Sequence, residues 1–446
     1  MAIITRFAPS PTGRLHVGNL RQAIHNWLFA RRHGGQFWLR IDDTDAARSR
    51  EEYVDAIHAD LGWLGLAPDG VERQSARMTR YQSVFDQLVA SGHLYPCYES
   101  AEELDIRRKI LLSRSLPPVY ERTSLMLSAD ERAAKEASGI SPHWRFKLNH
   151  DAPIIWDDAV RGEQKFDPAR LSDPVVRRAD GSWLYLLPSV IDDADMQVSH
   201  VIRGEDHVSN TASQLQMFVA IGAATPGFAH TALLTGAEGK LSKRLGALGC
   251  DAFRESGIEP EALFAMLARL GTADPVEPLI DRTPLIASFD FARFGRAPAR
   301  FDMAELEGLN ARIVHQFDHE HVAVRLPCGM DAAAWNAIRP NVAHVAEAAD
   351  WWAVVEGPIA GDGVEAEDKQ FCADAAQLAA QIDWGSDPWH ALTDGLKATS
   401  GRKGRALFLP LRRALTGRDH GPDMAALLPL IGQPRAVERL RVAASG

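Results

Sequence analysis

The chain has 446 residues, of which 46% are hydrophobic and 24% are charged, and its formal net charge is −10. This composition is typical of a globular protein of about three domains, and no apolar run approaches the roughly 18 residues of a membrane span. The negative charge disfavours a general polyanion binder but leaves a local basic face open. Because the chain starts without the long apolar segment of a signal peptide, we expect a cytoplasmic protein with no membrane partner.

The first 66 residues alternate between strand and helix patterns. Residues 3–7 and 36–41 are apolar strand candidates. Between them, apolar residues recur at helical spacing, and the glycines of "HGG" at 33–35 favour the end of that helix there. A second amphipathic helix, "REEYVDAIHADLGWLGL", covers residues 50–66. This alternation predicts a parallel α/β sheet.

The pattern changes near residue 95. The segment "PCYESAEELDIRRKILLSRS" is a charged helix candidate, and "SADERAAKEASG" begins with the capping box Ser128 and Glu131. "HWRFKL" and "APIIWDDAV" look like antiparallel strands. Strand patterns return at 183–187 and 197–203, followed by a helix at 208–221 and a strand in "FAHTALL". We therefore expect an α+β insert of about 90 residues that splits the α/β sheet. After residue 252 we expect mostly helices, which become rich in alanine further along the chain.

A loop rich in proline and glycine joins the first strand to the first helix. In this loop, "PSPTGRLHVGN", His16 and Gly18 lie where the helix begins. A helix N-terminus offers free N–H groups and partial positive charge, and glycine admits a ligand close to the backbone. The spacing is equally compatible with a glycine-rich turn that carries a surface histidine.

A compact basic stretch, "GKLSKRLGA" at 239–247, follows the last predicted strand of the α/β part. Taken alone, such a run is more often a solvated basic loop. Lys240 and Lys243 are also the kind of residues that neutralise a triphosphate as it is attacked. Together with the loop of His16 at the other end of the same split sheet, this stretch favours a nucleotide site.

Several motifs resemble those of bacterial glutamyl-tRNA synthetases. "HVGN" is similar to the HIGH motif of class I aminoacyl-tRNA synthetases and "KLSKR" to their KMSKS loop. "RFAPSPTGRLHVGNLRQA", "LRIDDTD", "YLLPSVIDD" and "HVIRGEDH" resemble the glutamyl members in particular, and "LPLRRALTG" at 409–417 resembles a stretch of their anticodon-binding part. The resemblance implies a Rossmann-like catalytic domain split by an α+β insert and followed by an all-α anticodon-binding region.

The resemblance also implies domain boundaries. It implies two catalytic halves at 1–94 and 183–252, an acceptor-stem insert at 95–182, a helical stem-contact region at 253–310 and a helical anticodon-binding domain at 311–446.

The family's functional residues carry over to matching positions of this chain. The expected glutamate contacts are Arg6, Ala8, Ser10, Asp42, Tyr185 and Arg203, with Asp42 taking the α-ammonium. The expected ATP contacts are His16, Gly18, Asn19, Asp206, Leu234 and Lys243, with Asn19 giving at most a supporting hydrogen bond. His16, Gly18, Lys240 and Lys243 would act directly in catalysis. The chemistry agrees, because arginine's planar fork grips carboxylates and strand ends meet at the ligand crevice of a parallel sheet.

The implied reaction has two in-line steps. The glutamate carboxylate attacks the α-phosphorus of ATP, and the terminal adenosine hydroxyl of tRNA(Glu) then attacks the activated carbonyl. Neither step needs a protein nucleophile, so we expect catalysis by positioning and charge stabilisation, with Mg2+ bridging the phosphates. We expect a monomer.

Three departures from the family pattern affect these expectations. Asp42 replaces the usual glutamate, which shortens the side chain by one methylene. Some members bind zinc through C-x-C and a later Cys/His pair, but here Glu99 occupies the place of the second cysteine. Because the four cysteines of the chain are also scattered, we expect no zinc. Asn341 replaces an arginine associated with rejection of tRNA(Gln), so the protein would also charge tRNA(Gln) unless Asn341 is an ordinary helix-start residue.

Four rival readings are compatible with parts of the chain. A glutaminyl-tRNA synthetase shares the catalytic half but has a β-barrel anticodon part. A tRNA-modifying relative lacks the region 311–446, and small adenylyltransferases are far shorter. A tRNA-binding paralogue with an inactive site is disfavoured by the retained His16, Lys240, Lys243 and Arg203.

Overall fold

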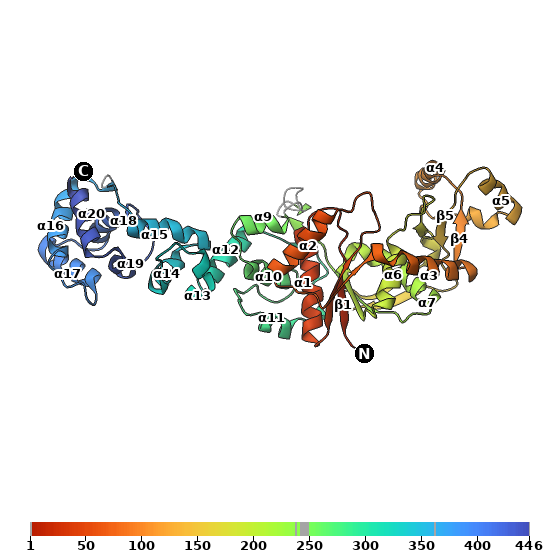
Figure 1. Cartoon of the computed structure of the whole chain (residues 1–446), viewed down its shortest axis with the longest axis horizontal. Helices are drawn as coiled ribbons and strands as arrows, with labels where there is room; N and C mark the ends of the chain where they lie inside the picture. Colours follow the sequence, from red (N-terminus) through yellow and green to blue (C-terminus); the bar gives the residue numbers. More distant parts are fainter. Residues whose placement is uncertain (1, 237–238, 241–248, 361–362, 446) are drawn as a thin grey trace. The chain divides into compact units, whose positions relative to one another are not determined.

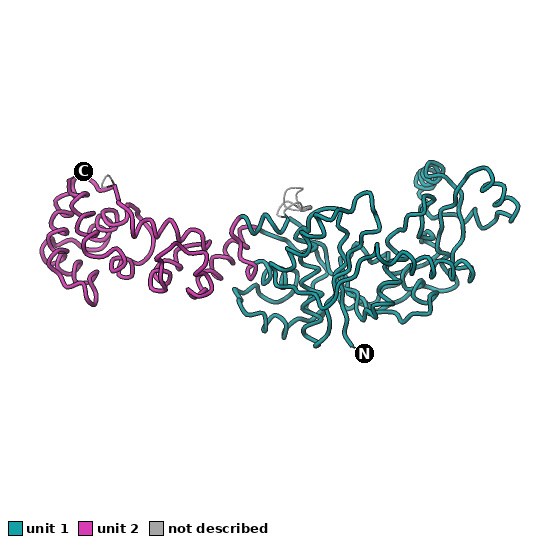
Figure 2. The backbone as a smooth tube through the Cα atoms, in the orientation of Figure 1, with its two compact units in different colours: residues 1–255, 263–302 teal, residues 256–262, 303–446 magenta. Residues whose placement is uncertain are grey.

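The computed structural model describes residues 2–236, 239–240, 249–360 and 363–445, and at 239–240 only the backbone. The chain forms two compact units, shown in Figure 2. Unit 1 comprises residues 1–255 and 263–302, and unit 2 comprises residues 256–262 and 303–446. The finer division into five regions stays a prediction.

Unit 1 begins with the predicted parallel α/β arrangement (Figure 1). Strands β1 (Ile4–Phe7), β2 (Gln36–Ile41) and β3 (Gly70–Arg73) form a parallel sheet in the order β1-β2-β3. Helices α1 (Val17–Arg32) and α2 (Glu51–Trp63) connect them. Helix α1 ends at its C-cap His33, followed by Gly34 at φ 61°, so the predicted stop is confirmed.

A second sheet continues beside the first. Its order is β7 (Gly162–Phe166), β6 (Ile154–Asp158), β10 (Gly227–Thr231), β9 (His200–Gly204), and all pairings except β6–β7 are parallel. Ser199, just before β9, donates its N–H to the Ile4 carbonyl at 2.9 Å, and its Oγ accepts from the Ile4 N–H at 2.8 Å. Strands β1 and β9 therefore lie side by side and bring their ends to one place.

The predicted α+β insert is present as a small antiparallel sheet with two exposed helices. Its strands are β4 (Leu94–Cys97), β5 (His143–Phe146) and β8 (Val175–Arg177), and its helices are α4 (Ala101–Ser113) and α5 (Ala129–Ala137). The capping box of Ser128 and Glu131 starts α5 as predicted. "HWRFKL" and "APIIWDDAV" do contain strands, β5 and β6, but they belong to different sheets rather than pairing with each other.

The strand predicted at 183–187 is wrong. Trp183 makes only an isolated bridge with Arg177, and helix α6 (Leu186–Asp195) begins almost at once. The buried residues Leu187, Val190 and Ile191 follow helical spacing, and a proline in the first turn is compatible with a helix.

The remaining helices and strands of unit 1 include the strands of one more sheet, which has three strands. They are α3 (Met78–Ala90), α7 (Val208–Ala220), β11 (Leu234–Gly236), β12 (Gly239–Lys240), α9 (Cys250–Glu255), α11 (Thr283–Ser288) and β13 (Ala299–Arg300), and α10 (Pro260–Arg269) begins in unit 2 and ends in unit 1. A continuous apolar core, with Tyr81, Phe85 and Trp183 among its largest members, fills the space between α3, α6 and α7.

Unit 2 is all-helical among its described residues, as the alanine-rich pattern predicts. Its helices are α12 (Met303–Val314), α13 (His319–Val322), α14 (Ala332–Ile338), α15 (Ala348–Glu356), α16 (Lys369–Ala379), α17 (Pro388–Ser400), α18 (Arg405–Thr416), α19 (Met424–Ile431) and α20 (Gln433–Ser445). Throughout the part of the chain that the structure describes, no helix is long and apolar enough to cross a membrane.

One buried arginine ties the ends of two of these helices to a third. Arg439 on α20 donates to the carbonyls of Leu415 near the end of α18 and of Val354, Val355 and Gly357 at the end of α15, at 2.6 to 3.0 Å. These are carbonyls that helix ends leave without a partner inside the helix. The positive charge also lies where helix dipoles favour a cation.

We predict that Arg439→Met lowers the free energy of unfolding by about 2–4 kcal/mol, because it leaves several buried carbonyls without a hydrogen-bond donor. Chemical denaturation of the full chain measures this. Arg441→Met, at an exposed position of the same helix, is the matched control, and equal effects of the two substitutions would contradict the assignment.

Candidate active site

A cavity of about 630 Å³ lies at the ends of β1 and β9. It is lined by the loop that follows β1, the start of α1, the end of β9 and the start of β11. The sequence-predicted residues that line it are Arg6, Ala8, Ser10, His16, Gly18, Asn19, Tyr185, Arg203, Asp206 and Leu234. Residues from distant parts of the sequence are thus brought together around one space.

The histidine–glycine motif has a local structural cause. His16 is the N-cap of α1: its Nδ1 accepts from the Gly18 N–H at 3.1 Å, and the Asn19 side chain accepts from the His16 N–H at 3.2 Å. A Cβ at Gly18 would lie 3.0 Å from the imidazole, which explains the glycine. Burial lowers the pKa of His16. Because Nδ1 is an acceptor, the neutral ring carries its proton on Nε2, and no described residue accepts a hydrogen bond from it.

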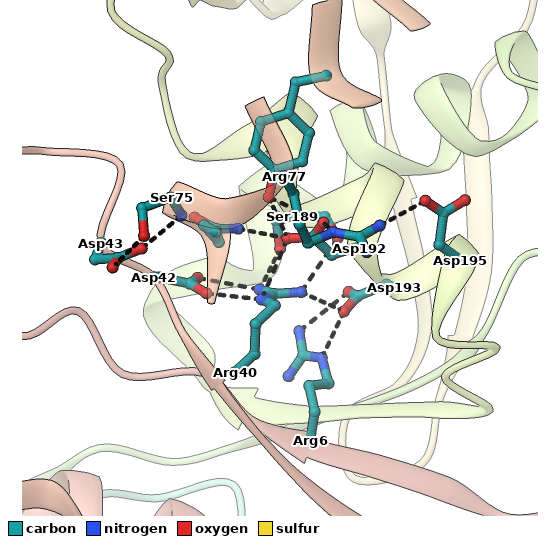
Figure 3. A network of polar contacts seen from close by, with 12 residues as sticks. Arg6, Arg40, Asp42, Asp43, Ser75, Arg77, Ser189, Asp192, Asp193 and Asp195 are labelled. Atoms are coloured by element: carbon teal, nitrogen blue, oxygen red, sulfur yellow. Dashed lines mark hydrogen bonds and ion pairs between the residues drawn. The ribbon is translucent and has the colours of Figure 1, made fainter. Parts of the chain in front are cut away.

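Arg6 is held at the cavity by a carboxylate that the sequence prediction did not assign. Its Nε and Nη2 donate to the two oxygens of Asp193 on α6, at 2.9 and 3.2 Å, as Figure 3 shows. Asp193 also accepts from Arg40 Nη1 at 2.7 Å. The signal was present in the motif "YLLPSVIDD", but nothing in the sequence says which arginine its aspartates contact.

Asp42 does not line the cavity. Its two oxygens accept from Arg40 Nε and Nη2 at 2.7 and 3.0 Å, and both residues are buried (Figure 3). Burial raises the pKa of Asp42 to about 6, despite the opposing effect of Arg40. A direct contact between Asp42 and a substrate ammonium would require one oxygen to leave Arg40, and that contact stays a prediction.

Arg203 is buried and faces the cavity, and within the described residues it has only neutral hydrogen-bond partners. Its guanidinium donates to Tyr185 Oη at 3.1 Å, Thr211 Oγ1 at 2.6 Å and Gln214 Oε1 at 2.7 Å. Among the described residues, no carboxylate lies within ion-pairing distance of it, although Asp193 acts on it electrostatically from further away. Burial lowers the pKa of Arg203. A cation in this state favours an anionic ligand.

The orientation of Arg203 is set by a second layer that the sequence analysis missed. Asp158 on β6 lies 2.5 Å from Nδ1 of the buried His230 on β10. The carboxylate therefore fixes the proton on Nδ1, and Nε2 accepts from Arg203 Nε at 3.2 Å. His230 lies in "FAHTALL", where residues 228–232 are all buried, so a histidine inside a mostly apolar strand pattern was the available signal.

Besides Asp42, three other predicted residues are not among those that line the cavity. Lys240 lies in β12, where only the backbone is described, and Lys243 lies outside the described residues. Asn341 is exposed in a short 3-10 helix of unit 2 (Arg339–Asn341). Their predicted roles remain proposals.

The insert contains three side chains close enough to share a metal ion. Ligand atoms of Cys97, Glu99 and His143 lie within 4.8 Å of one another. However, burial raises the pKa of the Cys97 thiol to about 11, and His143 Nε2 accepts from Arg145 at 3.3 Å. Glu99 accepts from the hydroxyls of Tyr120, Thr123 and Ser124. The sequence analysis overlooked His143 as a third candidate ligand, and a fourth is absent from this cluster in the described chain.

Comparison with known proteins decides the family. The model of "tRNA synthetases class I (E and Q), catalytic domain" matches residues 2–308, and an anticodon-binding domain model matches residues 364–444. The chain belongs to the class I tRNA synthetase family. It is 65% identical to "Glutamate--tRNA ligase 1" of Rhizorhabdus wittichii, over 99% of this chain and 100% of the relative. It is 64% identical to "Glutamate--tRNA ligase 2" of Erythrobacter litoralis, over 99% and 98%.

A solved structure supports the same class I synthetase fold. A glutamate tRNA ligase from Elizabethkingia meningosepticum, crystallised with its amino acid, superposes with a TM-score of 0.88 at 25% identity, covering 100% of this chain and 99% of that one. The split catalytic domain and the helical C-terminal region expected from the motifs are therefore confirmed.

We predict that His230→Phe raises the KM for the amino-acid substrate about tenfold, because a hydrogen bond to a charged group contributes about 1.5–3 kcal/mol. The KM for ATP should change little, whereas the free energy of unfolding should fall, because the buried Asp158 loses a partner. Steady-state ATP–pyrophosphate exchange measures both constants. His230→Gln, whose amide oxygen can still accept from Arg203, should recover part of the loss. Equal rises in both KM values would assign His230 a general structural role instead.

We also predict that the purified protein contains less than about 0.1 zinc per chain, since a tetrahedral structural site needs four ligands. Elemental analysis measures the content, and EDTA should leave the thermal midpoint unchanged. One zinc per chain, or a midpoint lowered by chelation, would contradict this prediction.

Proposed function

We propose that this protein ligates L-glutamate to the 3′ end of tRNA(Glu) in an ATP-dependent reaction that passes through a glutamyl-adenylate. The observation that carries the proposal is Arg203, a buried guanidinium that faces the cavity and has no carboxylate partner among the described residues. The full-length identity to relatives named glutamate–tRNA ligase supports the same substrate.

The amino acid would bind between Arg6 and Arg203, two of the three arginines that line the cavity. Arg203, which has no carboxylate partner among the described residues, would bind one carboxylate of the amino acid. Arg6, which already forms an ion pair with Asp193, would offer a second contact. Tyr185 lies against Arg203 and would close the same subsite, with Ala8 and Ser10 on the opposite loop. Glutamine has no second carboxylate, so binding it would leave the Arg203 charge buried without a counter-charge, which disfavours it.

Asp42 is proposed to act at the ammonium end of the amino acid. In the unliganded arrangement its carboxylate is shared with Arg40. The aspartate is one methylene shorter than the glutamate of the family pattern, so the contact requires either a change in that pair or a bridging water.

ATP would bind along the loop and helix that follow β1. His16 Nε2 and the partial positive charge at the start of α1 suit phosphate oxygens, and the glycine at position 18 leaves room for them to approach. Asn19 serves the cap of α1, which agrees with a supporting role. Asp206 and Leu234 border the same space. Lys240 and Lys243 are proposed to neutralise the triphosphate, and Mg2+ bound to ATP would add positive charge there.

The chemistry then needs no protein nucleophile. A carboxylate oxygen of glutamate attacks the α-phosphorus, the bond from that phosphorus to the bridging oxygen breaks, and pyrophosphate leaves. The terminal adenosine hydroxyl of the tRNA next attacks the activated carbonyl, and AMP leaves. The residues around the cavity contribute positioning and fixed positive charge.

Which tRNAs the enzyme charges is the part of the proposal that depends on unit 2. The helical region 311–446 is proposed to bind the anticodon. Asn341, exposed and in place of an arginine, is proposed to relax the exclusion of tRNA(Gln), so that the enzyme also makes glutamyl-tRNA(Gln). We further propose that the protein acts as a monomer in the cytoplasm.

Charging of purified tRNA(Glu) and tRNA(Gln) with labelled glutamate or glutamine tests the proposal. We expect glutamate on tRNA(Glu), a slower transfer of glutamate to tRNA(Gln), and no transfer of glutamine. Asn341→Arg should reduce charging of tRNA(Gln) severalfold and leave charging of tRNA(Glu) within about twofold, as expected when one weakly discriminating contact changes.

Asn336→Arg in the neighbouring α14 adds the same charge at another exposed position and is the matched control. Transfer of glutamine but not glutamate would refute the amino-acid assignment. Unchanged charging of tRNA(Gln) by Asn341→Arg would refute only the role of Asn341.

A further inference from the structure

A second, smaller cavity lies inside the insert and is separate from the candidate active site. It has a volume of about 160 Å³ and is formed between helix α4, the segment 118–121 and strand β5. Leu111, Val119 and the Tyr120 ring contribute apolar wall. Arg107 and Arg108 of α4 and Arg145 of β5 contribute three guanidinium groups.

Arg145 is a buried residue of the cavity wall, and one of its N–H groups has no acceptor among the described residues. It is 7% exposed, its Nη1 donates to the Asp173 carbonyl at 2.6 Å, and its Nε donates to His143 Nε2 at 3.3 Å. Its guanidinium lies over the Tyr120 ring, 4.1 Å from the centroid. No described residue accepts from Nη2. Stacking on the ring fixes the plane of the guanidinium and therefore the direction of its free N–H groups.

The other two arginines are exposed at the mouth of this cavity. Arg107 Nη1 donates to Thr123 Oγ1 at 3.1 Å, and Arg108 makes no hydrogen bond within the described chain. Across the described residues, none of the three arginines has a carboxylate within 4.0 Å. Glu121, at the rim, is the acidic residue in the lining, so the lining carries a net charge of +2 from three arginines and one glutamate.

The nearby carboxylates are already committed to other partners. Glu99 accepts from three hydroxyl groups, and Asp173 accepts from Arg122 at 2.7 Å and from Tyr95 Oη at 2.6 Å. The three guanidiniums around the cavity are therefore left without a matching anion from the described protein.

We infer that this cavity is a subsite for a phosphate group. Guanidinium groups that converge from a helix and a strand can donate to oxygens in several directions, which suits a tetrahedral phosphate better than a planar carboxylate. The apolar wall beside the buried Arg145 lowers the local dielectric and strengthens the attraction between its guanidinium and a phosphate. The phosphate would come either from a polynucleotide backbone or from a free phosphate, because both offer the same oxygens.

The test compares phosphate binding by full-length variants. Inorganic phosphate is titrated calorimetrically into the wild type, Arg107→Ala/Arg108→Ala, and the charge-matched control Lys109→Ala/Arg114→Ala. Both pairs of residues are exposed on or next to α4, but only the first pair lines the cavity. We expect the cavity variant to lose one class of phosphate sites or to bind there at least tenfold more weakly, and the control to match the wild type.

The salt dependence of binding to total tRNA then separates the two sources. If the cavity holds a backbone phosphate of a polynucleotide, the cavity variant should show a slope of log K against log salt that is smaller by about 0.7–0.9 than that of the control. A free-phosphate subsite leaves the slope unchanged. Identical phosphate isotherms for all three proteins would overturn the inference, whatever the tRNA result. Because no amino acid or ATP is present, this outcome is independent of the glutamate charging test.

Discussion

The buried guanidinium of Arg40 is the interaction on which the candidate active site depends. Arg40 is fully buried on β2, and it donates to Asp42 just beyond the strand and to Asp193 and Ser189 on α6. The carboxylates around it raise the pKa of Arg40 in spite of its burial. Removing one partner from such a buried network typically costs about 3–5 kcal/mol, because a charge is left uncompensated. The network therefore joins the first sheet to α6 in one arrangement.

The charges of the cavity follow from this constraint. Asp193 is fixed by Arg40 and in turn holds Arg6 on β1. Arg203 on β9 interacts electrostatically with Asp193, but its hydrogen bonds go to neutral groups. The Asp158–His230 pair sets its orientation. The charge of Arg6 is thus balanced by Asp193, whereas Arg203 is left for a ligand. Charges that are already oriented need little reorganisation when a substrate reacts, which is how such sites stabilise a transition state.

Local and non-local features of the sequence differ in how far they could be predicted. The strands and the helix around His16 followed from apolar spacing and from the glycines at 34–35, because those signals act within a few residues. The strand predicted at 183–187 failed because a short apolar run fits both a strand and a helix. The motifs identified Arg6 and Arg203 as cavity residues, but which acids they contact depends on packing between distant elements. For the same reason, His143 and His230 were overlooked.

The most direct test of this account is the glutamate-dependent change in the free energy of unfolding of the wild type and of Arg203→Met. A ligand that binds only the folded state stabilises it in proportion to RT ln(1 + [L]/Kd). The account predicts that L-glutamate stabilises the wild type and has no effect on Arg203→Met, while ATP stabilises both. If Arg203→Met gained as much stability from glutamate as the wild type does, the unmatched charge of Arg203 would not be the substrate-binding group.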